Sequence, residues 1–274
     1  MADTIVFYHH NCPDGFSAAW ITWKKFKDTA KYQWWAYHTA FNFDFKNKTI
    51  YFLDIGPTKE MVKHLMKHNE VIIIDHHISM QQIVKIASDH SFSVDHCAAV
   101  LAWHYFFPRK PLPHFLSYIE DLDLWRFKHS HSKEINAAIG LVDFDFTIWD
   151  KMARSLETNK GRKEYIQKGK TIVAYRDQLI GQITSRAQRV MFEGHEALAV
   201  NSSVFVSEVG NALLERHCSL AIIWFEGKNK KNVSLRSKET IDAAHLAQKY
   251  GGGGHKAAAG FVLDLNEPFP WKNL

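Results

Sequence analysis

One short stretch, Val71 to His77 (VIIIDHH), most constrains how this chain can fold. Four β-branched apolar residues run directly into an aspartate and two histidines. A continuous run of this kind is typical of a strand buried on both faces of a parallel sheet. Because open parallel sheets bind ligands beyond the carboxyl ends of their strands, Asp75, His76 and His77 are predicted to lie at a binding site. A carboxylate beside two imidazoles suits a divalent cation.

Two further apolar runs end in a similar way. Thr4 to Tyr8 (TIVFY) leads into a polar segment that contains Asp14, and Thr49 to Leu53 (TIYFL) leads into Asp54. Asp121, in SYIEDLDLW, is a fourth candidate. If the strands are parallel neighbours, these groups converge, and carboxylates packed so closely would repel one another and take up protons. Bound metal cations would remove that conflict.

The chain here resembles a known family, the DHH phosphoesterases. The resemblance covers nearly the whole chain and rests on five motifs in the family's order: His10 to Gly15 (HNCPDG), Asp54, Asp75-His76-His77, Asp121 and Gly251 to Phe261 (GGGGHKAAAGF). The last motif is similar to the glycine-rich motif of the accessory domain called DHHA1. Within the superfamily, the patterns HxNCPDGFSAAW and EDLDLW are most similar to the branch of short-oligoribonucleases and cyclic-nucleotide phosphodiesterases.

The order of predicted elements and the resemblance together predict an α/β fold in two domains. Strands alternate with helices, which is typical of a parallel sheet with flanking helices. We expect an N-terminal DHH metal-binding domain over residues 1–155 and a linker helix over residues 156–190. A smaller C-terminal α/β DHHA1 domain, which would bind substrate, is expected over residues 191–274.

Some individual elements are predicted on weaker patterns. Gln33 to Tyr37 is predicted as a strand, Ser79 to Ser88 as a helix and Arg162 to Arg189 as a long polar helix. The apolar positions of that long helix are too sparse for a coiled coil. The alternating phenylalanines of Phe41 to Phe45 could stack on bases, although packing in the core is the favoured interpretation.

Composition narrows the classes of function. The net charge of +5 (34 basic minus 29 acidic side chains) is mild and favours a small anionic substrate or short nucleic acid over long duplex DNA. Cys12, Cys97 and Cys218 form no CxxC pair, which indicates a reducing compartment. With no signal-peptide pattern and no apolar run near ~20 residues, we expect a cytoplasmic protein with no membrane partner. The oligomeric state stays open, a homodimer included.

The resemblance implies a role for each motif residue. His10 and Asp14 would bind one metal ion, Asp54 would bridge two ions, and His76 and Asp121 would bind the second. Two cations about 3.5–4 Å apart would turn water into hydroxide and hold the attacking and leaving oxygens. The large share of hard oxygen ligands points to Mn²⁺, with Mg²⁺ as second choice.

Two residues of the DHH triplet would act close to the substrate. Asp75 would either be a metal ligand or orient His76 through a hydrogen bond. His77 would contact the scissile phosphate.

The C-terminal domain would hold a phosphate or the nucleotide. Arg236 suits this role because its planar guanidinium can bind phosphate through two hydrogen bonds. The backbone N–H groups of Gly251, Gly252, Gly253 and Gly254 would form an anion-binding nest, and His255 would act beside them.

The first motif departs from the family's pattern. Many members carry a second aspartate two residues after the first, where this chain has Phe16, so the second metal would be short of a ligand. Asn11 or Cys12 could substitute, and a Cys12 thiolate would favour Zn²⁺ or Fe²⁺ over Mn²⁺.

Two of the ligand assignments have a close competitor. His9 competes with His10, and Asp123 competes with Asp121, because each pair offers the same chemistry at nearly the same position. The favoured interpretation treats His9 and Asp123 as solvated neighbours.

The activity these residues imply is metal-dependent hydrolysis of short oligoribonucleotides or other small nucleotides. A cyclic mono- or dinucleotide would use the same site, and the sequence does not separate the two. A third hypothesis, favoured by Phe16, is a degenerate protein that binds nucleotides without catalysis. RNA or DNA preference, strand polarity and the identity of the metal stay open.

Overall fold

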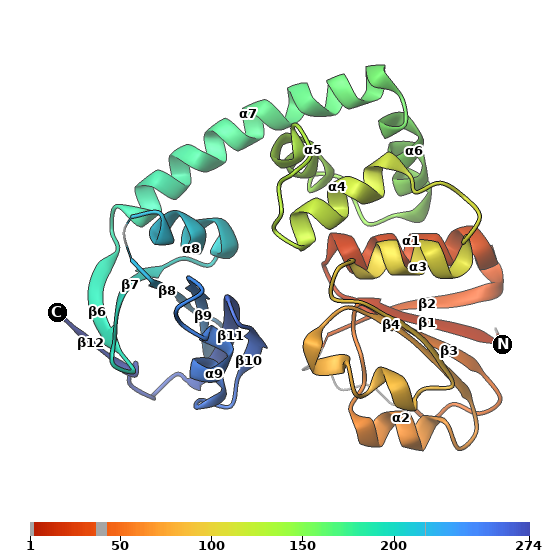
Figure 1. Ribbon diagram of the computed structural model, residues 1–274, viewed down its shortest axis with the longest axis horizontal. Coiled ribbons are helices and arrows are strands. Elements are labelled where there is room, and N and C mark those ends of the chain that lie inside the picture. The colour runs from red at the N-terminus through yellow and green to blue at the C-terminus, as the bar shows by residue number, and fades with distance from the viewer. Residues whose placement is uncertain (1–2, 37–42, 217) are drawn as a thin grey trace. The chain divides into compact units, whose positions relative to one another are not determined.

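The computed structural model describes residues 3–36, 43–216 and 218–274. Contacts divide the chain into two compact units, Met1–Val173 and Ala174–Leu274. The expected linker helix is observed as α7 (Asn159–Thr184), which runs through this division (Figure 1). The domain limits predicted from the sequence stay a prediction.

The first unit is built on a parallel sheet of five strands among the described residues, in the order β2-β1-β3-β4-β5. The strands are β1 (Thr4–His9), β2 (Ala30–Trp35), β3 (Thr49–Leu53), β4 (Glu70–Asp75) and β5 (Asp89–Phe92). The chain leaves β1 for its neighbour β2 and then returns to the other side of β1 for β3. The carboxyl ends of β1 and β3 therefore flank the point where the strand order reverses, which is where open α/β sheets bind ligands.

The apolar strands are buried on both faces, as the sequence predicted. In β4, Ile72 and Ile74 belong to the core on one face, and Val71 and Ile73 belong to the core on the other. Helices α1 (Pro13–Phe26) and α3 (Ala98–Phe106) cover the first face, and α2 (Lys59–Leu65) covers the second (Figure 1). The predicted α/β class is confirmed.

The remaining helices of the first unit extend the core over α1. They are α4 (His114–Asp123), α5 (Ser132–Ile139) and α6 (Phe146–Leu156). Trp149 of α6 is fully buried and its ring meets Phe16 at a centroid distance of 5.1 Å. Phe16 also contacts Tyr8 and Phe146, so the side chain that replaces the family's second aspartate is a core residue.

The helix predicted over Ser79 to Ser88 is wrong. The segment forms two short 3-10 turns, Ile78–Met80 and Val84–Ile86, and is followed by β5. Its β-branched residues lose side-chain freedom in a helix, and so short a helix is marginal without strong tertiary support. The sequence of β5, DHSF, has no apolar alternation and therefore does not predict a strand.

The second strand is shifted from its predicted position. It is observed over Ala30–Trp35, and Tyr37 lies outside the described residues, as does Phe41. Phe43 and Phe45 pack against Phe7, with ring centroids 5.3 and 6.1 Å away, which agrees with the core interpretation.

The second unit is built on a seven-stranded sheet among its described residues, in the order β10-β11-β9-β8-β7-β6-β12. The strands are β6 (Gln188–Phe192), β7 (His195–Asn201), β8 (Leu220–Glu226), β9 (Lys230–Ser237), β10 (Gly253–His255), β11 (Ala258–Asp264) and β12 (Trp271–Asn273). Only β7 and β8 pair in parallel within this set. The predicted long helix to Arg189 ends at Thr184 instead, because Gln188 to Phe192 pairs with β7.

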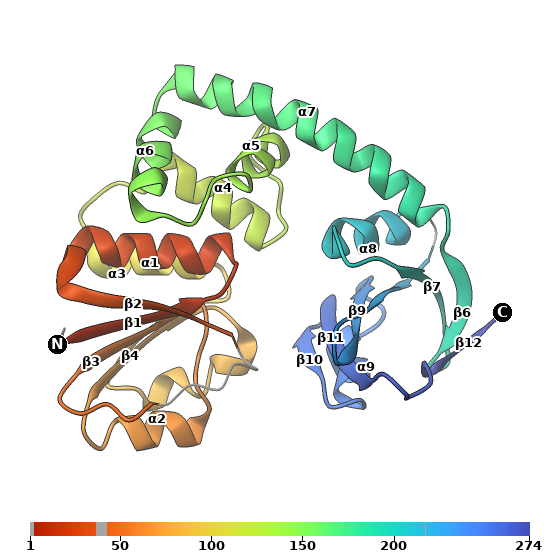
Figure 2. The same ribbon diagram turned by 180° about the vertical axis from the view of Figure 1, so that it is seen from behind.

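Two helices cover the two faces of this second sheet (Figure 2). Helix α8 (Val206–Leu214) packs Val209 against one face, and α9 (Ala243–Gln248) packs Leu246 against the other. No helix in the described part of the chain is both long and apolar enough to cross a membrane.

Candidate metal centre

Asp54 lies at the centre of the candidate site. It follows β3 directly, is 2% exposed and has a φ of +57°, a left-handed conformation that is costly for a residue with a Cβ. Such strain costs about 1–3 kcal/mol and is found mainly at functional sites. The Asp54 N–H donates to the Ile74 carbonyl at 3.0 Å, which ties this conformation to the neighbouring strand.

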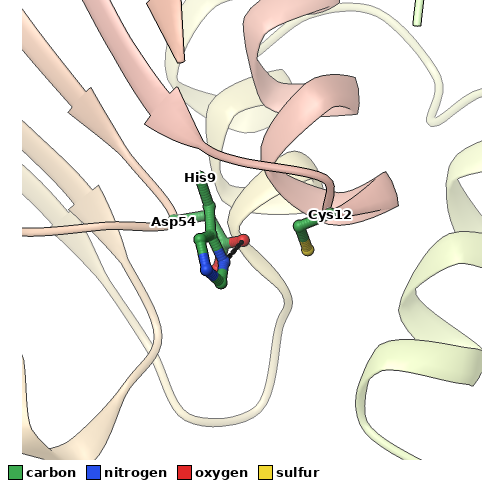
Figure 3. Close-up of side chains that lie close together, drawn as sticks. All are labelled: His9, Cys12 and Asp54. Atoms are coloured by element: carbon green, nitrogen blue, oxygen red, sulfur yellow. Dashed lines mark hydrogen bonds and ion pairs between the residues drawn. The ribbon is translucent and has the colours of Figure 1, made fainter. Parts of the chain in front are cut away.

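His9 meets Asp54 across the switch point of the sheet. In the β1–β3 register Tyr8 pairs with Leu53, so the next residue of each strand, His9 and Asp54, come together. His9 Nδ1 lies 3.3 Å from Asp54 Oδ2, and Cys12 lies beside them at the start of α1 (Figure 3).

Gly15 makes room for His9. A Cβ on Gly15 would lie 2.8 Å from His9 Cβ, closer than real contacts allow, and 3.0 Å from the His9 nitrogen, which is tighter than most real contacts. The Asp-Gly pair of the first motif therefore lets α1 begin directly beneath the end of β1.

Asp14, in the first turn of α1, is held by another helix. Its Oδ2 and Oδ1 atoms accept hydrogen bonds from the first two N–H groups of α3, those of Ala98 and Ala99, both at 2.8 Å. A carboxylate at a helix N-terminus is stabilised by those N–H groups and by the helix dipole. Burial, together with the nearby charges of Asp54 and Asp123, nevertheless raises the pKa of Asp14 well above its usual value.

His76 connects three carboxylates. Its Nε2 atom lies 3.4 Å from Asp54 Oδ1, 3.5 Å from Asp123 Oδ2 and 3.9 Å from Asp14 Oδ2. The His76 side chain is 8% exposed, and within the described residues its Nε2 makes no hydrogen bond. Buried polar atoms nearly always have a partner, so this atom and its carboxylate neighbours fit a cation.

The charges around His76 shift its pKa strongly. Although burial lowers the pKa of His76, the interaction with Asp54 and the charges of Asp14 and Asp123 raise it to about 10. Burial and the charge of Asp54 raise the pKa of Asp123 to about 6. Burial opposes ionisation of Asp54 as well, but His76 and His9 hold its pKa below the usual value.

The ligand atoms form three overlapping groups in the described part of the chain. The groups, each with its ligand atoms within 4.8 Å of one another, are His9-Cys12-Asp54, Asp54-His76-His77 and Asp14-His76-Asp123. Asp54 and His76 each belong to two groups, so the groups form one continuous centre of mixed nitrogen, oxygen and sulfur donors.

His10, like Asp121 and Asp75 described below, does not occupy the place expected of a metal ligand. His10 is exposed and its ring packs on Trp34, with centroids 4.2 Å apart. Successive residues of a strand point to opposite sides, so only one of His9 and His10 can face Asp54. In the H-x-N-C pattern that carried the resemblance, one residue separates the histidine from Asn11, which already indicates His9.

For a similar reason, Asp123 and not Asp121 lies beside His76. Residues two apart on a helix point in nearly opposite directions, so α4 can present only one of them to His76. The Asp121 side chain instead accepts the N–H groups of Lys128 and His129 at 2.8 and 3.0 Å and organises the loop after α4. Although burial raises the pKa of Asp121, these N–H groups lower it overall.

Asp75 orients His77 and not His76. The Asp75 Oδ1 atom lies 2.8 Å from both the backbone nitrogen and Nδ1 of His77. Although burial lowers the pKa of His77, the contact with Asp75 raises it. Asp75 belongs to none of the three groups found among the described residues, although its buried Oδ2 has no hydrogen-bond partner there.

Arg236, the predicted phosphate ligand of the second unit, is held in place by α8. Its Nη2 atom donates to Ser207 Oγ at 2.8 Å, and Nη1 donates to the Leu235 carbonyl at 2.8 Å. A Cβ on Gly210 would lie 2.5 Å from Arg236 Cγ, so this glycine makes room for the arginine. Burial lowers the pKa of Arg236, and the charge of Glu208 opposes this shift.

The glycine run has two kinds of position. Gly252 and Gly254 are required by the fold, because a Cβ there would lie 2.1 Å from the Gly260 carbonyl oxygen or 2.5 Å from that of Ala258. Gly251 and Gly254 have positive φ values of +72° and +144°. A Cβ on Gly253 would meet nothing within 4 Å, so the fold does not explain why this residue is glycine. His255 is exposed at the end of the same short strand, β10.

The fold and the site define a class: a two-unit α/β protein with a candidate cation centre at the switch point of a parallel sheet. The model of the DHHA1 domain family matches residues 201–270. Uncharacterized protein R106 of Acanthamoeba polyphaga mimivirus is 30% identical over 290 residues, which is 94% of this chain and 67% of that protein.

One further relative in sequence and one solved structure are similar to this chain. Oligoribonuclease NrnB of Bacillus subtilis is 28% identical over 163 residues, but the match covers 56% of this chain and only 40% of NrnB. The solved DHH domain of a protein assigned to a family of ribosomal proteins is 13% identical, with a TM-score of 0.54, over 95% of this chain and 82% of that one. The solved domain shows the same fold, and the sequence matches show that the chain belongs to the DHH/DHHA1 phosphoesterase family.

The different roles of Asp121 and Asp123 can be tested with matched variants. We expect Asp121→Asn to destabilise the protein by about 1–3 kcal/mol, because an amide cannot accept both loop N–H groups. We expect Asp123→Asn to fold normally but to bind Mn²⁺ about tenfold or more weakly, a change typical of altered metal sites. Urea unfolding and calorimetric Mn²⁺ titration measure the two effects, and the reverse pattern would contradict the assignment.

Cation binding should compete with protons. A ligand nitrogen must be neutral to bind a metal, and the pKa of His76, about 10, keeps it protonated at pH 7 before a cation binds. Mn²⁺ affinity should therefore rise with pH between 5 and 8, and binding at pH 7 should release about one proton or more.

Calorimetry of Mn²⁺ binding in two buffers of different ionisation enthalpy measures that release. The matched control is His96→Asn, since His96 pairs with Glu120 and belongs to none of the three groups found in the described ranges. It should release as many protons as the unmodified protein. Binding heats that do not depend on the buffer would contradict the prediction.

Proposed function

We propose that the protein is a metal-dependent phosphodiesterase that hydrolyses short oligoribonucleotides or related small nucleotides. The observation that carries the proposal is the centre in which Asp54 and His76 are shared by overlapping ligand groups. Buried carboxylates and an imidazole arranged in this way are suited to holding more than one cation. The similarity to NrnB, which is named an oligoribonuclease, supports the substrate class.

The cation ligands in this proposal come from separate segments of the first unit. Asp14, Asp54, His76 and Asp123 would hold cations, and His9 would complete the centre beside Asp54. We propose Mn²⁺ as the natural ion, with Mg²⁺ second, because carboxylate oxygens dominate among these residues. When bound, the ions supply an activated water and stabilise the negative charge that develops on the phosphate.

His77 is proposed to contact the scissile phosphate. Asp75 fixes its ring through Nδ1, and 27% of the His77 side chain is exposed. The raised pKa favours a positively charged ring, which would attract phosphate oxygens. Asp75 therefore acts as the positioning residue of this histidine.

The second unit is proposed to hold a phosphate of the nucleotide. Arg236 would offer its planar guanidinium, and the backbone near Gly253 would offer N–H groups. Ser207 orients the guanidinium by hydrogen bonding, which reduces the entropy lost when a phosphate binds. A nucleotide of the cytoplasm is the partner that this chemistry suits.

A hydrolysis panel tests the activity. With Mn²⁺ present, we expect release of mononucleotides from a linear dinucleotide, and slower reaction with a pentanucleotide, cyclic nucleotides and 3′-phosphoadenosine 5′-phosphate. Asp54→Ala should lose activity by at least about 10³-fold, since a nucleophile-generating centre would be broken. Chromatography of the products measures each rate. No hydrolysis of any substrate across a series of metals would overturn the proposal.

A substitution at Gly253 tests whether the glycine run binds a phosphate. Gly253→Ala should leave the free energy of unfolding within about 0.5 kcal/mol, because its Cβ would meet nothing within 4 Å. It should lower kcat/KM for the dinucleotide about tenfold, or ~1.4 kcal/mol, by blocking approach of a phosphate. The comparison variant Gly254→Ala should destabilise the fold by about 1–3 kcal/mol, because its φ is +144°. Unchanged kinetics in Gly253→Ala would count against phosphate binding there.

A further inference from the structure

Cys12 lies at the N-cap of α1 but does not cap the helix through a side-chain hydrogen bond. It is the N-cap residue of α1, where serine, threonine, aspartate or asparagine normally accepts a backbone hydrogen bond, and its side chain makes no such bond. It lies directly before the Pro13-Asp14-Gly15 turn that brings Asp14 and His9 into the centre. A side-chain cap bond therefore does not account for a cysteine at this position.

The structure places the Cys12 sulfur beside two strong metal ligands. One ligand nitrogen of His9, the Sγ atom of Cys12 and one carboxylate oxygen of Asp54 lie within 4.8 Å of one another (Figure 3). The three come from the end of β1, the start of α1 and the end of β3. Asp54 also faces the buried His76 Nε2, 3.4 Å away, which has no hydrogen-bond partner among the described residues. A cation held between Asp54 and His76 would give this buried nitrogen a partner.

The other group of donors differs in chemistry. Asp14, His76 and Asp123 offer two carboxylates and one imidazole, a set that suits Mn²⁺ or Mg²⁺. Replacing one oxygen donor by a thiolate shifts preference toward Zn²⁺, Co²⁺ or Fe²⁺, because sulfur is the softer ligand. One imidazole, one thiolate and one carboxylate with an open position also match the three-ligand arrangement of catalytic zinc sites.

We propose that Cys12 is a metal ligand, and that the His9-Cys12-Asp54 position selects a thiolate-binding divalent cation such as Zn²⁺, while the Asp14-His76-Asp123 position takes a harder one. The inference rests on the proposed metal-dependent function and changes its cofactor from two like ions to two unlike ones. Binding breaks the S–H bond of Cys12, forms a sulfur–metal bond and releases one proton to solvent, with no change in oxidation state.

Cobalt provides the most direct test. The metal-free full-length protein is titrated with Co²⁺ to saturation, and its absorption is compared with those of Cys12→Ser and Cys218→Ser. Cys218 is the matched control, since it lies in the second unit and its thiol donates to the Leu213 carbonyl. We expect a near-ultraviolet sulfur-to-cobalt charge-transfer band in the unmodified protein and in Cys218→Ser, and its loss in Cys12→Ser.

Two outcomes would overturn the inference. One is visible Co²⁺ d–d absorption without the charge-transfer band, and the other is a band that persists in Cys12→Ser. Zinc X-ray absorption of the unmodified protein needs no variant and covers the case in which Cys12→Ser fails to fold. A sulfur shell at about 2.3 Å supports the proposal, and a shell of nitrogen and oxygen alone refutes it.

Competition between metals tests the selectivity. Loaded with equal Zn²⁺ and Mn²⁺, the unmodified protein should retain one Zn²⁺, and Cys12→Asp should lose about tenfold or more of that preference. An unchanged preference would refute the selectivity. The hydrolysis panel tests the proposed function separately. Hydrolysis without the sulfur-to-metal signal would refute only the Cys12 inference. The sulfur-to-metal signal without hydrolysis would refute only the phosphodiesterase proposal.

Discussion

The mutual repulsion of buried carboxylates is the constraint on which the first unit depends. Asp14 and Asp54 are 1% and 2% exposed and lie close to the same histidine nitrogen. Charges removed from water in this way are costly unless they are paired. The protein pairs them partly by itself, through α3 for Asp14 and through His9 and His76 for Asp54. What remains uncompensated is the charge that a cation would balance.

The fold supplies this centre through its connectivity. Because β1 is flanked by β2 on one side and β3 on the other, the segments that follow β1 and β3 leave the sheet at the same edge, at its switch point. The left-handed turn at Asp54 and the close approach of Gly15 to His9 then bring the side chains to within contact distance. Each of these features is a local cost or restriction that packing alone would not select, which is typical of functional sites.

Much of this organisation could be predicted from the sequence. The buried apolar runs of β1, β3 and β4 identified the parallel sheet, and their polar ends identified the edge that carries the centre. The five motifs in order identified the family. These signals are strong because a strand buried on both faces leaves little freedom in composition.

The choice between adjacent candidates could be predicted only in part: the H-x-N-C spacing points to His9, but no comparable spacing separates Asp121 from Asp123. His9 and His10 differ only in which side of a strand they face, and Asp121 and Asp123 only in their direction from a helix. Those choices depend on register and helix rotation, which are set by distant packing partners. The strands β10, β12 and β5 could not be predicted for a related reason. The first two have three residues each and β5 is polar, so only pairing with neighbouring strands makes them strands.

The two hydrogen bonds from α3 to Asp14 make one side chain serve two purposes. The same carboxylate that faces the cation centre also closes the N-terminus of a helix in the main core. Cation binding here would link the occupancy of the centre to the integrity of that helix, since a ligand that binds only the folded state stabilises it. In a cell, the supply of such a cation would then govern how long each molecule escapes degradation.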